Sequence, residues 1–504
     1  MLLKTLLAGV GLDLPTGSLV VETSTIVISM IVGTVVTMVA AFLPARKAGK
    51  VPPVAAMRDV AVDSTGTSRR RLVVGTSVTT IGAAALLGGL AGGGLPLVGL
   101  GALVTFLGVA ALAPVLSRPA ARLLGWPAAK ATSMSGDLAR NNAMRNPRRT
   151  ASTAAALMIG VGLVGFIAIF AASSKASINV AVDKEYNGDY VLDTGSFGFG
   201  GVSHDLADEV SNSPQFSAVT ATRPWASEVD GTSMNLFSWD AATVPTLFDI
   251  GVAQGDPTQL GSDGIAVQQD FATEHGYAIG SPVNVAFVQG NVTLTVEAIY
   301  DDELWVGQAF VDHSVVDALG ADPLDMSIYV QIADGTSNAE ARAELDRLAE
   351  AYPTITVMDR DEFKADRAGE INMILNLIYA LLGLAIVIAL LGITNTLALS
   401  IFERTRELGL LRAVGMTRGQ LKATVRFEAV IIALFGTLLG LAIGAFFGWS
   451  IVNALADEGL GELTIPVPTL VVVTSIAALA GVAASLLPAR RAARLDVLGA
   501  ISSQ

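Results

Sequence analysis

The charged run at residues 403–420 has the residue types and spacing best suited to specific contacts in this chain. Glu403 with Arg406, and Arg404 with Glu407, are three residues apart, which places opposite charges side by side on a helix. Because such pairs neutralise one another locally, the run is suited to binding at a surface. It predicts a short helix, a turn and a second helix.

The ends of these two helices are also marked in the sequence. Gly415 permits a left-handed residue that stops the first helix, and Thr417 with Gln420 forms a capping box for the second. Leu410 and Val414 share one face of the first helix. A short amphipathic helix of this kind either docks into a groove of another protein or lies in the lipid interface. The pattern alone leaves both interpretations open.

Several kinds of catalytic chemistry have no support in the sequence. The chain contains no Cys, which excludes disulfides, thiolate nucleophiles and thiolate metal sites. His204, His275 and His313 are scattered, and the acidic run 301–303 is more typical of a solvated loop than of a cation site. The sequence has no Walker A pattern, so it offers no loop to cradle nucleotide phosphates. We therefore predict no catalytic residue, no metal and no cofactor.

Composition indicates which elements position the charged run. Of the 504 residues, 52% are hydrophobic and 15% are charged, and the mean hydropathy of +0.57 is too apolar for a soluble protein. A helix of about 20 apolar residues crosses a bilayer. Seven segments are long enough and sufficiently uncharged to do so: 24–43, 73–93, 96–117, 152–174, 371–401, 427–448 and 467–487. The predicted fold class is an α-helical transmembrane bundle of about seven spans.

The charges are divided unevenly along the chain. The net charge is −13, but residues 175–370 carry 33 acidic and 8 basic residues, while the remainder carries 12 acidic and 24 basic. This asymmetry indicates that an acidic region and basic loops face different compartments. We therefore predict one extracytoplasmic α+β domain at 175–370, and no nucleic-acid partner.

Orientation follows from the short loops. Lys and Arg are concentrated in 44–71, 118–150 and 402–426, whereas the connection 449–466 has none. Basic loops stay on the cytoplasmic side of a membrane. The sequence thus predicts a multi-pass protein of the plasma membrane with a cytoplasmic C-terminus, and places 175–370 outside.

The outer segment mixes strand and helix patterns. Residues 283–288 and 292–296 alternate apolar and polar side chains, which predicts two strands joined by a hairpin turn. Residues 339–352 have the spacing of an amphipathic helix, and Ser337 with Glu340 forms a capping box before it. Both kinds of element are expected in an α+β domain.

Four glycines in the segment 427–448 are spaced four residues apart: Gly436, Gly440, Gly444 and Gly448. Small residues at this spacing form a stripe that lets another helix approach to backbone contact. We predict such a contact, either within the chain or across a dimer.

A short repeat links the two ends of the chain. The sequence Leu-Pro-Ala-Arg-Lys-Ala at 43–48 recurs as Leu-Pro-Ala-Arg-Arg-Ala at 487–492, each time after an apolar span. This pattern favours one complete module preceded by the tail of another. The alternative is that basic residues simply follow each span on the cytoplasmic side.

The motif Arg-x-x-Glu-Leu-Gly-x-Leu-Arg-Ala-Val-Gly at 404–415 resembles the signature of the FtsX-like permeases, the membrane subunits of ABC transporters of the macrolide-exporter and lipoprotein-release type. Residues 138–150 resemble the amphipathic helix that this family places before the span leading to its outer domain. The resemblance covers 138–504, and 24–60 resembles the end of a first copy. The chain thus resembles a duplicated permease that lacks its first half.

The resemblance implies a function and assigns residues to it. It assigns coupling with an ATP-binding domain to Arg404, Glu407, Gly409, Arg412 and Gly415. The implied partners are a separate ABC ATPase subunit, the lipid bilayer and a second permease copy or dimer partner. The implied activity is export or extraction of an amphipathic substrate. The alternative is a transmembrane scaffold that regulates an extracytoplasmic cell-wall hydrolase.

These observations predict five regions along the chain. They are the tail of a first module at 1–60, two linker spans with a cytoplasmic loop at 61–137, a leading helix and span at 138–174, the outer domain at 175–370, and a three-span permease core at 371–504.

Overall fold

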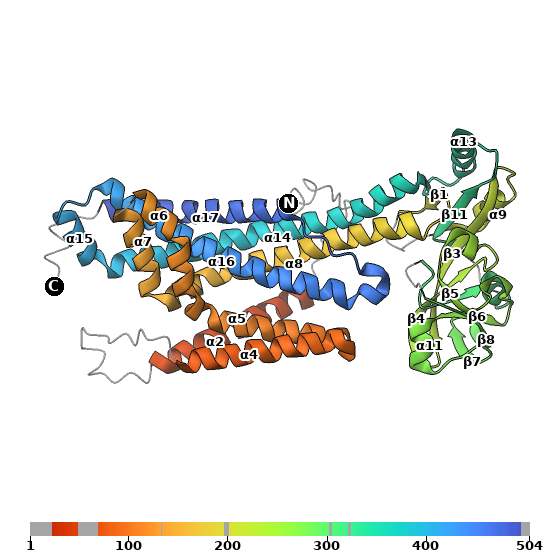
Figure 1. The fold of residues 1–504 in the computed structure, drawn as a ribbon, viewed down its shortest axis with the longest axis horizontal. Helices are drawn as coiled ribbons and strands as arrows, with labels where there is room; N and C mark the ends of the chain where they lie inside the picture. Colours follow the sequence, from red (N-terminus) through yellow and green to blue (C-terminus); the bar gives the residue numbers. More distant parts are fainter. Residues whose placement is uncertain are drawn as a thin grey trace.

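A computed structural model describes residues 23–48, 69–132, 134–195, 201–301, 305–320 and 324–494. The molecule is elongated, with long helices along most of its length and an α+β domain at one end (Figure 1). Most of the predicted first-module tail, including residues 1–22 and 49–60, lies outside the described residues.

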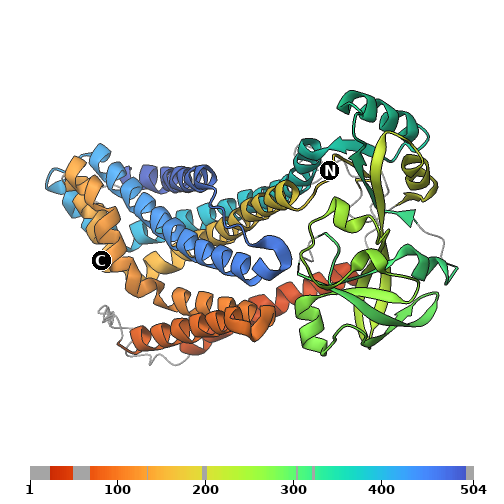
Figure 2. The ribbon, with the colours of Figure 1, turned by 45° about the vertical axis from the view of Figure 1, so that its right-hand side comes forward.

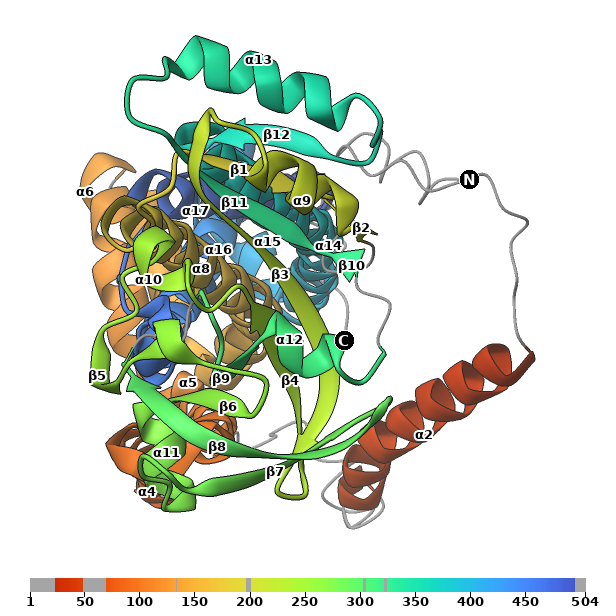
Figure 3. The same ribbon diagram turned by 90° about the vertical axis from the view of Figure 1, so that its right-hand side faces the viewer.

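Within the described ranges, seven long helices form the elongated part. They are α2 (Thr23–Ala48), α4 (Arg69–Gly88), α5 (Gly94–Leu124), α8 (Pro147–Lys184), α14 (Arg360–Glu403), α16 (Arg418–Ala454) and α17 (Val467–Ala493). Three shorter helices accompany them: α6 (Trp126–Thr132), α7 (Met134–Arg145) and α15 (Thr405–Ala413). End on, α2 stands apart from the other helices (Figure 3).

The predicted count of about seven spans is not confirmed. Among the described residues, five helical stretches are long and apolar enough to cross a membrane. The first of them, Arg69–Thr132, includes both α4 and α5, which were predicted as two spans. The predicted span 24–43 falls on α2, where the described apolar stretch, Val27–Met38, is shorter than a full crossing.

Helices α4 and α5 form a tight antiparallel hairpin. The chain reverses at Gly92, whose φ of 109° is a conformation that favours glycine. A Cβ built on Gly82 would lie 2.3 Å from the backbone N of Thr105, and one on Gly108 would lie 2.5 Å from the backbone N of Thr79. The two helices therefore meet through their backbones, as small residues permit in membranes.

Helices α8, α14, α16 and α17 enclose the main apolar core of the bundle. Val161 of α8, Ile393 of α14, Ala429 of α16 and Ala477 of α17 are each 0% exposed. Large apolar residues on the outer surfaces of these helices are exposed, as expected of surfaces that face lipid.

The outer domain is built on a ten-stranded sheet in the order β12-β1-β11-β3-β4-β9-β6-β8-β5, with β7 pairing to β3 and β8. The strands are β1 (Tyr190–Asp193), β3 (Phe216–Val229), β4 (Thr232–Trp239), β5 (Val252–Gly255), β6 (Gly264–Gln268), β7 (Pro282–Phe287), β8 (Gly290–Tyr300), β9 (Ala309–Asp312), β11 (Ser327–Ile332) and β12 (Thr356–Asp359). Strands β2 (Val202–Ser203) and β10 (Leu324–Asp325) form a separate pair.

Among the described residues of the outer domain, the short helices around this sheet are α9 (Asp205–Ser211), α10 (Val244–Leu247), α11 (Gln269–His275), α12 (His313–Asp317) and α13 (Asn338–Ala349). Helices α9 and α13 lie at one end of the sheet and α11 at the other (Figure 3). The long strand β3 pairs with β11 in the first part and with β4 and β7 in the second, so it connects both parts.

The predicted local elements of the outer domain are confirmed. Strands β7 and β8 pair as an antiparallel hairpin in which Phe287 faces Gly290. Helix α13 begins with the predicted capping box, in which Ser337 Oγ accepts a hydrogen bond from the Glu340 N–H at 3.3 Å. Short-range signals determine these elements, which is why the sequence predicts them.

Two spans continue into the outer domain. Helix α8 extends to Lys184 and α14 begins at Arg360, beyond the boundaries at 175 and 370. Polar contacts join the two extensions, because Arg360 donates to the carbonyl of Val182 at 2.5 Å and Lys364 pairs with Asp183. The paired helices therefore form a continuous stalk between the bundle and the sheet (Figure 2).

Candidate functional site

The predicted surface helix is α15, at the end of the bundle opposite to the outer domain (Figure 1). Helix α14 stops at Arg404, where ψ is 19°, and α15 ends before Gly415, whose φ is 113°. The predicted left-handed stop is therefore confirmed. The capping box after it is confirmed as well, since Thr417 N–H donates to Gln420 Oε1 at 2.8 Å.

The two faces of α15 differ in burial. Leu408 is only 8% exposed and belongs to the main core of the bundle. In contrast, Leu410 is 48% exposed and Val414 is 89% exposed. The predicted apolar stripe thus lies on the outside of the helix, while the opposite face anchors it.

Only one of the two predicted charge pairs forms. Arg404 Nε donates to Glu407 Oε2 at 3.0 Å. The predicted pairing of Glu403 with Arg406 is wrong, because Glu403 lies 3.5 Å from Arg149 of α8 instead. The helix breaks at Arg404, so Glu403 and Arg406 belong to different helices and do not share the spacing of one continuous turn.

Arg404 also connects α15 to a buried polar network. Its guanidinium donates to Asn142 Oδ1 of α7 at 2.7 Å, and Asn142 Nδ2 lies 3.4 Å from Glu428 Oε2 of α16. Glu428 is 5% exposed, and its other oxygen lies 3.7 Å from Arg149 of α8. The network thus joins four helices at the foot of the bundle.

Sequence reasoning did not assign a coupling role to Asn142, Arg149 or Glu428. Asn142 and Arg149 lie in the stretch 138–150 that resembles the family's leading helix, and Glu428 is an ionisable residue at the edge of a span. Buried charges require partners. An ionisable residue at the edge of an apolar span therefore indicates, from the sequence alone, that Glu428 contacts a basic or amide side chain.

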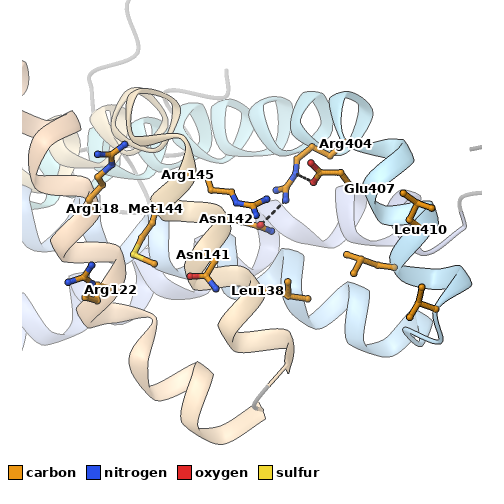
Figure 4. A pocket seen from close by; sticks show the side chains of 12 residues that line it. Arg118, Arg122, Leu138, Asn141, Asn142, Met144, Arg145, Arg404, Glu407 and Leu410 are labelled. Atoms are coloured by element: carbon orange, nitrogen blue, oxygen red, sulfur yellow. Dashed lines mark hydrogen bonds and ion pairs between the residues drawn. The ribbon is translucent and has the colours of Figure 1, made fainter. Parts of the chain in front are cut away.

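A groove of about 810 Å³ lies beside this network (Figure 4). Helix α5 contributes Arg118 and Arg122, and α7 contributes Arg145. Helix α15 contributes the apolar side chain of Leu410, and Val414 follows directly after the helix. The groove therefore has a cationic side and an apolar side, which suits a partner segment with both acidic and apolar residues.

The structure separates the five residues assigned to coupling. Arg404 and Glu407 line the groove. Gly409 is buried on the inner face of α15, Arg412 is half-buried in its last turn, and Gly415 is exposed after it. Only two of the five therefore reach the surface where a partner would bind, and the others shape or anchor the helix.

The glycine stripe of α16 faces α8 of the same chain. A Cβ on Gly440 would lie 2.6 Å from the carbonyl O of Met158, and one on Gly444 would lie 2.4 Å from that of Gly162. Gly436 meets the carbonyl O of Ala154 in the same way, while a Cβ on Gly448 would lie 2.8 Å from the side chain of Ile169. The two helices run in parallel at backbone contact, and no larger residue fits there without displacing one of them.

The outer domain contributes no metal centre among the residues that the structure describes, where no group of three His, Asp or Glu side chains comes together. His313 is half-buried near Arg223, and its ring Nδ1 lies 3.0 Å from Ser238 Oγ. Burial, aided by the Arg223 charge, lowers the pKa of His313 to about 3. This His is therefore neutral at physiological pH and has a structural environment.

The class that the structure defines is a helical membrane protein with one large α+β domain on a two-helix stalk and a short surface helix at the other end. Residues 379–497 match the family of the FtsX-like permease C-terminal region. Residues 150–348 match the MacB-like periplasmic core domain. The family resemblance inferred from the sequence is therefore confirmed over these two ranges.

Curated relatives carry names of the same class. The chain is 30% identical to an ABC transporter permease of Bacillus subtilis, YknZ, over 181 residues. This match covers 35% of this chain and 44% of YknZ. It is 26% identical over 204 residues to the macrolide export ATP-binding/permease protein MacB of Escherichia coli, covering 40% of this chain and 31% of MacB.

A permease of Mycobacterium tuberculosis, Rv0987, is 23% identical over 512 residues, which covers 94% of this chain and 57% of Rv0987. The chain thus spans less than two thirds of the length of these relatives. Among solved structures, the periplasmic region of MacB from Actinobacillus actinomycetemcomitans is 16% identical with a TM-score of 0.30, covering 36% of this chain and 94% of that one.

Proposed function

We propose that this chain is the permease subunit of an ABC transporter, that ATP is hydrolysed on a separate polypeptide, and that the complex exports or extracts an amphipathic substrate. The relatives' names support the class, since they include ABC transporter permeases and macrolide exporters. The comparisons do not favour the alternative, a scaffold that regulates a cell-wall hydrolase.

The groove beside α15 is the observation that carries the proposal. It combines the arginines of α5 and α7 with the exposed apolar face of α15. The adjoining network links that helix to α7, α8 and α16. Helix α8 extends beyond the bundle as part of the stalk of the outer domain. A partner that pushes on the groove would therefore act on α8 through the network.

Orientation and partners belong to the same proposal. The arginine-rich groove is at the cytoplasmic end, in agreement with the positive-inside distribution of charge, so the C-terminus is cytoplasmic and residues 175–370 are outside. The ATPase is separate because the sequence has no Walker A pattern. A second permease copy or a dimer partner is part of the same proposal, which the similarity to ABC transporter permeases supports.

The test is ATP hydrolysis by a stand-alone ABC ATPase of the same genome, measured with and without the full chain in lipid nanodiscs. We expect the chain alone to hydrolyse no ATP and to stimulate one such ATPase. Glu407→Ala removes a groove charge, and Gly415→Pro forbids the positive φ that ends α15. Both are expected to abolish stimulation.

Arg406→Ala is the matched control, because Arg406 is exposed on α15 and lies outside both the groove lining and the network. It removes one charge from the same helix and is expected to preserve stimulation. Hydrolysis by the chain alone, or normal stimulation by both Glu407→Ala and Gly415→Pro, would overturn the assignment.

A further inference from the structure

Helix α6 presents a second surface at the end of the bundle opposite to the outer domain. Helices α6 and α7 run across the long helices rather than along them (Figure 1), and end on, α6 lies at the edge of the bundle (Figure 3). Among the described residues of 123–134, none lines the groove beside α15. This surface is therefore separate from the site proposed for the ATPase.

Close backbone contacts hold α6 against α7. A Cβ built on Gly136 of α7 would lie 2.1 Å from the carbonyl O of Ala128, so only a residue without a side chain permits this approach. At the turn before α6, a Cβ on Gly125 would lie 2.7 Å from Cγ of Arg140. Ala128 and Ala129, beside Gly136, are half-buried. The opposite face of α6 is therefore fixed in direction and points away from α7.

This outward face of α6, with the helix ends on either side of it, is largely apolar. Leu123 at the end of α5 is 74% exposed, Trp126 of α6 is 55% exposed and Met134 at the start of α7 is 45% exposed. All three lie between the predicted spans 96–117 and 152–174. Within a span, exposed apolar side chains face hydrocarbon, whereas outside one they indicate an interaction surface. Tryptophan is typical of the boundary between membrane and water.

Positive charge accompanies this apolar face. Residues 118–150 carry seven basic residues and one acidic residue, Asp137, which already lies 2.7 Å from Arg140. Lys130 of α6 is exposed and has no carboxylate partner among the described residues. Its ammonium lies 5.2 Å from the ring centroid of Trp126. A cation beside an exposed aromatic ring suits an anionic group at the edge of an apolar layer.

These features together are those of a helix that lies in a lipid interface. Such a helix runs in the membrane plane, with Trp and aliphatic side chains on one face and cations beside them. Helix α6 has seven residues, too few to supply by itself the area that a stable protein interface buries. Anionic phospholipids, in contrast, attract basic side chains close to the membrane surface without a large interface.

We propose that the outward face of α6 binds anionic phospholipid headgroups. Leu123, Trp126 and Met134 enter the acyl boundary of the leaflet, and Lys130 contacts the phosphate. Because α6 is packed on α7, which carries Asn142 of the buried network, lipid bound here holds that network at the membrane surface. That this leaflet is the cytoplasmic one rests on the orientation proposed above, whereas the binding itself requires no ATPase.

The test is quenching of Trp126 fluorescence by brominated phospholipids, with the full chain in nanodiscs of phosphatidylcholine and phosphatidylglycerol. All nanodiscs contain the same fraction of phosphatidylglycerol, and bromine is carried either by this lipid or by an equal amount of phosphatidylcholine. Bromine quenches tryptophans that contact the brominated lipid. The signal of Trp126 is the difference between the unsubstituted chain and Trp126→Phe.

Trp449 is the matched control at the other end of the bundle. It is 36% exposed near the outer end of α16, and the adjoining connection 449–466 has no basic residue. Its signal is obtained in the same way with Trp449→Phe. We expect brominated phosphatidylglycerol to quench Trp126 about twofold to fivefold more than brominated phosphatidylcholine does. For Trp449 we expect no preference for phosphatidylglycerol.

Two substitutions test the charge that the proposal invokes. Lys130→Gln should lower the preference of Trp126 for phosphatidylglycerol to about half or less. Arg490→Gln removes an exposed cation of α17 at the same end of the bundle and should leave the preference unchanged. High salt should remove the preference but not the quenching itself, because screening weakens charge attraction and not apolar contact.

Equal quenching of Trp126 by the two brominated lipids would overturn the proposal, and so would an unchanged preference in Lys130→Gln. Absence of quenching by either lipid would also overturn it, since α6 would then face water or a protein partner. None of these results touches the coupling proposal, which is measured by ATP hydrolysis. Loss of ATPase stimulation with normal lipid preference would conversely refute only the coupling proposal.

Discussion

Helices α8 and α14 are joined at both ends, but by different chemistry. At the outer end, Arg360 and Arg367 make contacts of 2.5 and 2.7 Å, and stacked aromatic rings pack beside them. At the inner end, the contacts of Arg149 with Glu403 and Glu428 are 3.5 and 3.7 Å, and an open groove lies next to them. The outer junction is therefore closely packed, while the Arg149 contacts at the inner junction are longer, although Arg404 there donates to Asn142 at 2.7 Å.

This difference indicates how motion would travel through the molecule. Loosely bonded polar contacts can exchange partners at low cost, whereas a packed aromatic core resists deformation. A partner at the groove would rearrange the inner junction, and the stalk would carry the movement to the outer domain as a rigid body. Stability should accordingly depend on the packed regions and coupling on the inner network.

The largest effect on stability is expected at the contact between α8 and α16. Gly440→Leu forces a side chain against the Met158 carbonyl and should cost more than about 3 kcal/mol, which reduces the yield of folded protein. Gly383→Leu is the control, because a Cβ there meets nothing within 4 Å. Thermal unfolding in nanodiscs measures both, and equal stability of the two variants would refute the close contact.

The outer junction should come next. Asp193 is 4% exposed and accepts hydrogen bonds from Arg367 and Ser327, each at 2.7 Å. Asp193→Ala leaves Arg367 with Glu370 at 3.2 Å as its remaining carboxylate partner and Ser327 without its acceptor, and should destabilise the protein by about 2 kcal/mol. Asp361→Ala, which removes a 94% exposed carboxylate near Lys364, should change stability by less than about 0.5 kcal/mol. Similar losses in both variants would contradict the account of a packed outer end.

His313 should make a smaller, pH-dependent contribution to the stability of the outer domain. Its folded pKa of about 3 is below the ordinary value of 6.5, so the unfolded chain binds more protons between those values. The stability that this His contributes is present above pH 6.5 and is lost as the pH falls towards 3. Between pH 7 and 5 the loss should be about 1 to 2 kcal/mol and should be absent in His313→Gln. The measurement is the midpoint of thermal unfolding as a function of pH. The same pH dependence in the unsubstituted chain and in His313→Gln would refute this contribution of His313.

The smallest change in stability is expected from Glu428→Gln at the inner junction. The amide can still bond Asn142, and Arg149 keeps Glu403 as a partner, so the loss should be about 1 kcal/mol or less. ATPase stimulation should nevertheless fall, because the charge that links α16 to α8 is gone. A variant that is strongly destabilised, or that stimulates normally, would reverse the contrast between the two ends.

Sequence predicted the parts that depend on short-range signals. Capping boxes at Ser337 and Thr417 and the left-handed stop at Gly415 each depend on a few neighbouring residues. The stripe from Gly436 to Gly448 showed that another helix approaches, but not which one. The helix break at Arg404, which separates Glu403 from Arg406, was not visible in the charge pattern.

Long-range juxtapositions were beyond reach for a physical reason. Asn142 and Glu428 are 286 positions apart, and only the packing of α7 on α16 brings them together. The cavity where α8 and α14 meet the outer domain likewise combines residues from these two helices and several strands, among them Thr222, Trp239 and Phe363. The periodicity of one helix or strand does not indicate such long-range contacts, because these contacts arise from tertiary packing.

Spin-label distances between α8 and α14 test the proposed transmission of motion most directly. Since the chain has no Cys, labels can be placed at one inner pair, Arg148→Cys with Phe402→Cys, and one outer pair, Lys184→Cys with Ala365→Cys, all of which are exposed. With the partner ATPase, ATP and vanadate, the inner distance should change by several ångströms while the outer distance stays constant. An inner distance that does not change when nucleotide is added, or an outer distance that increases instead, would contradict the coupling that we propose.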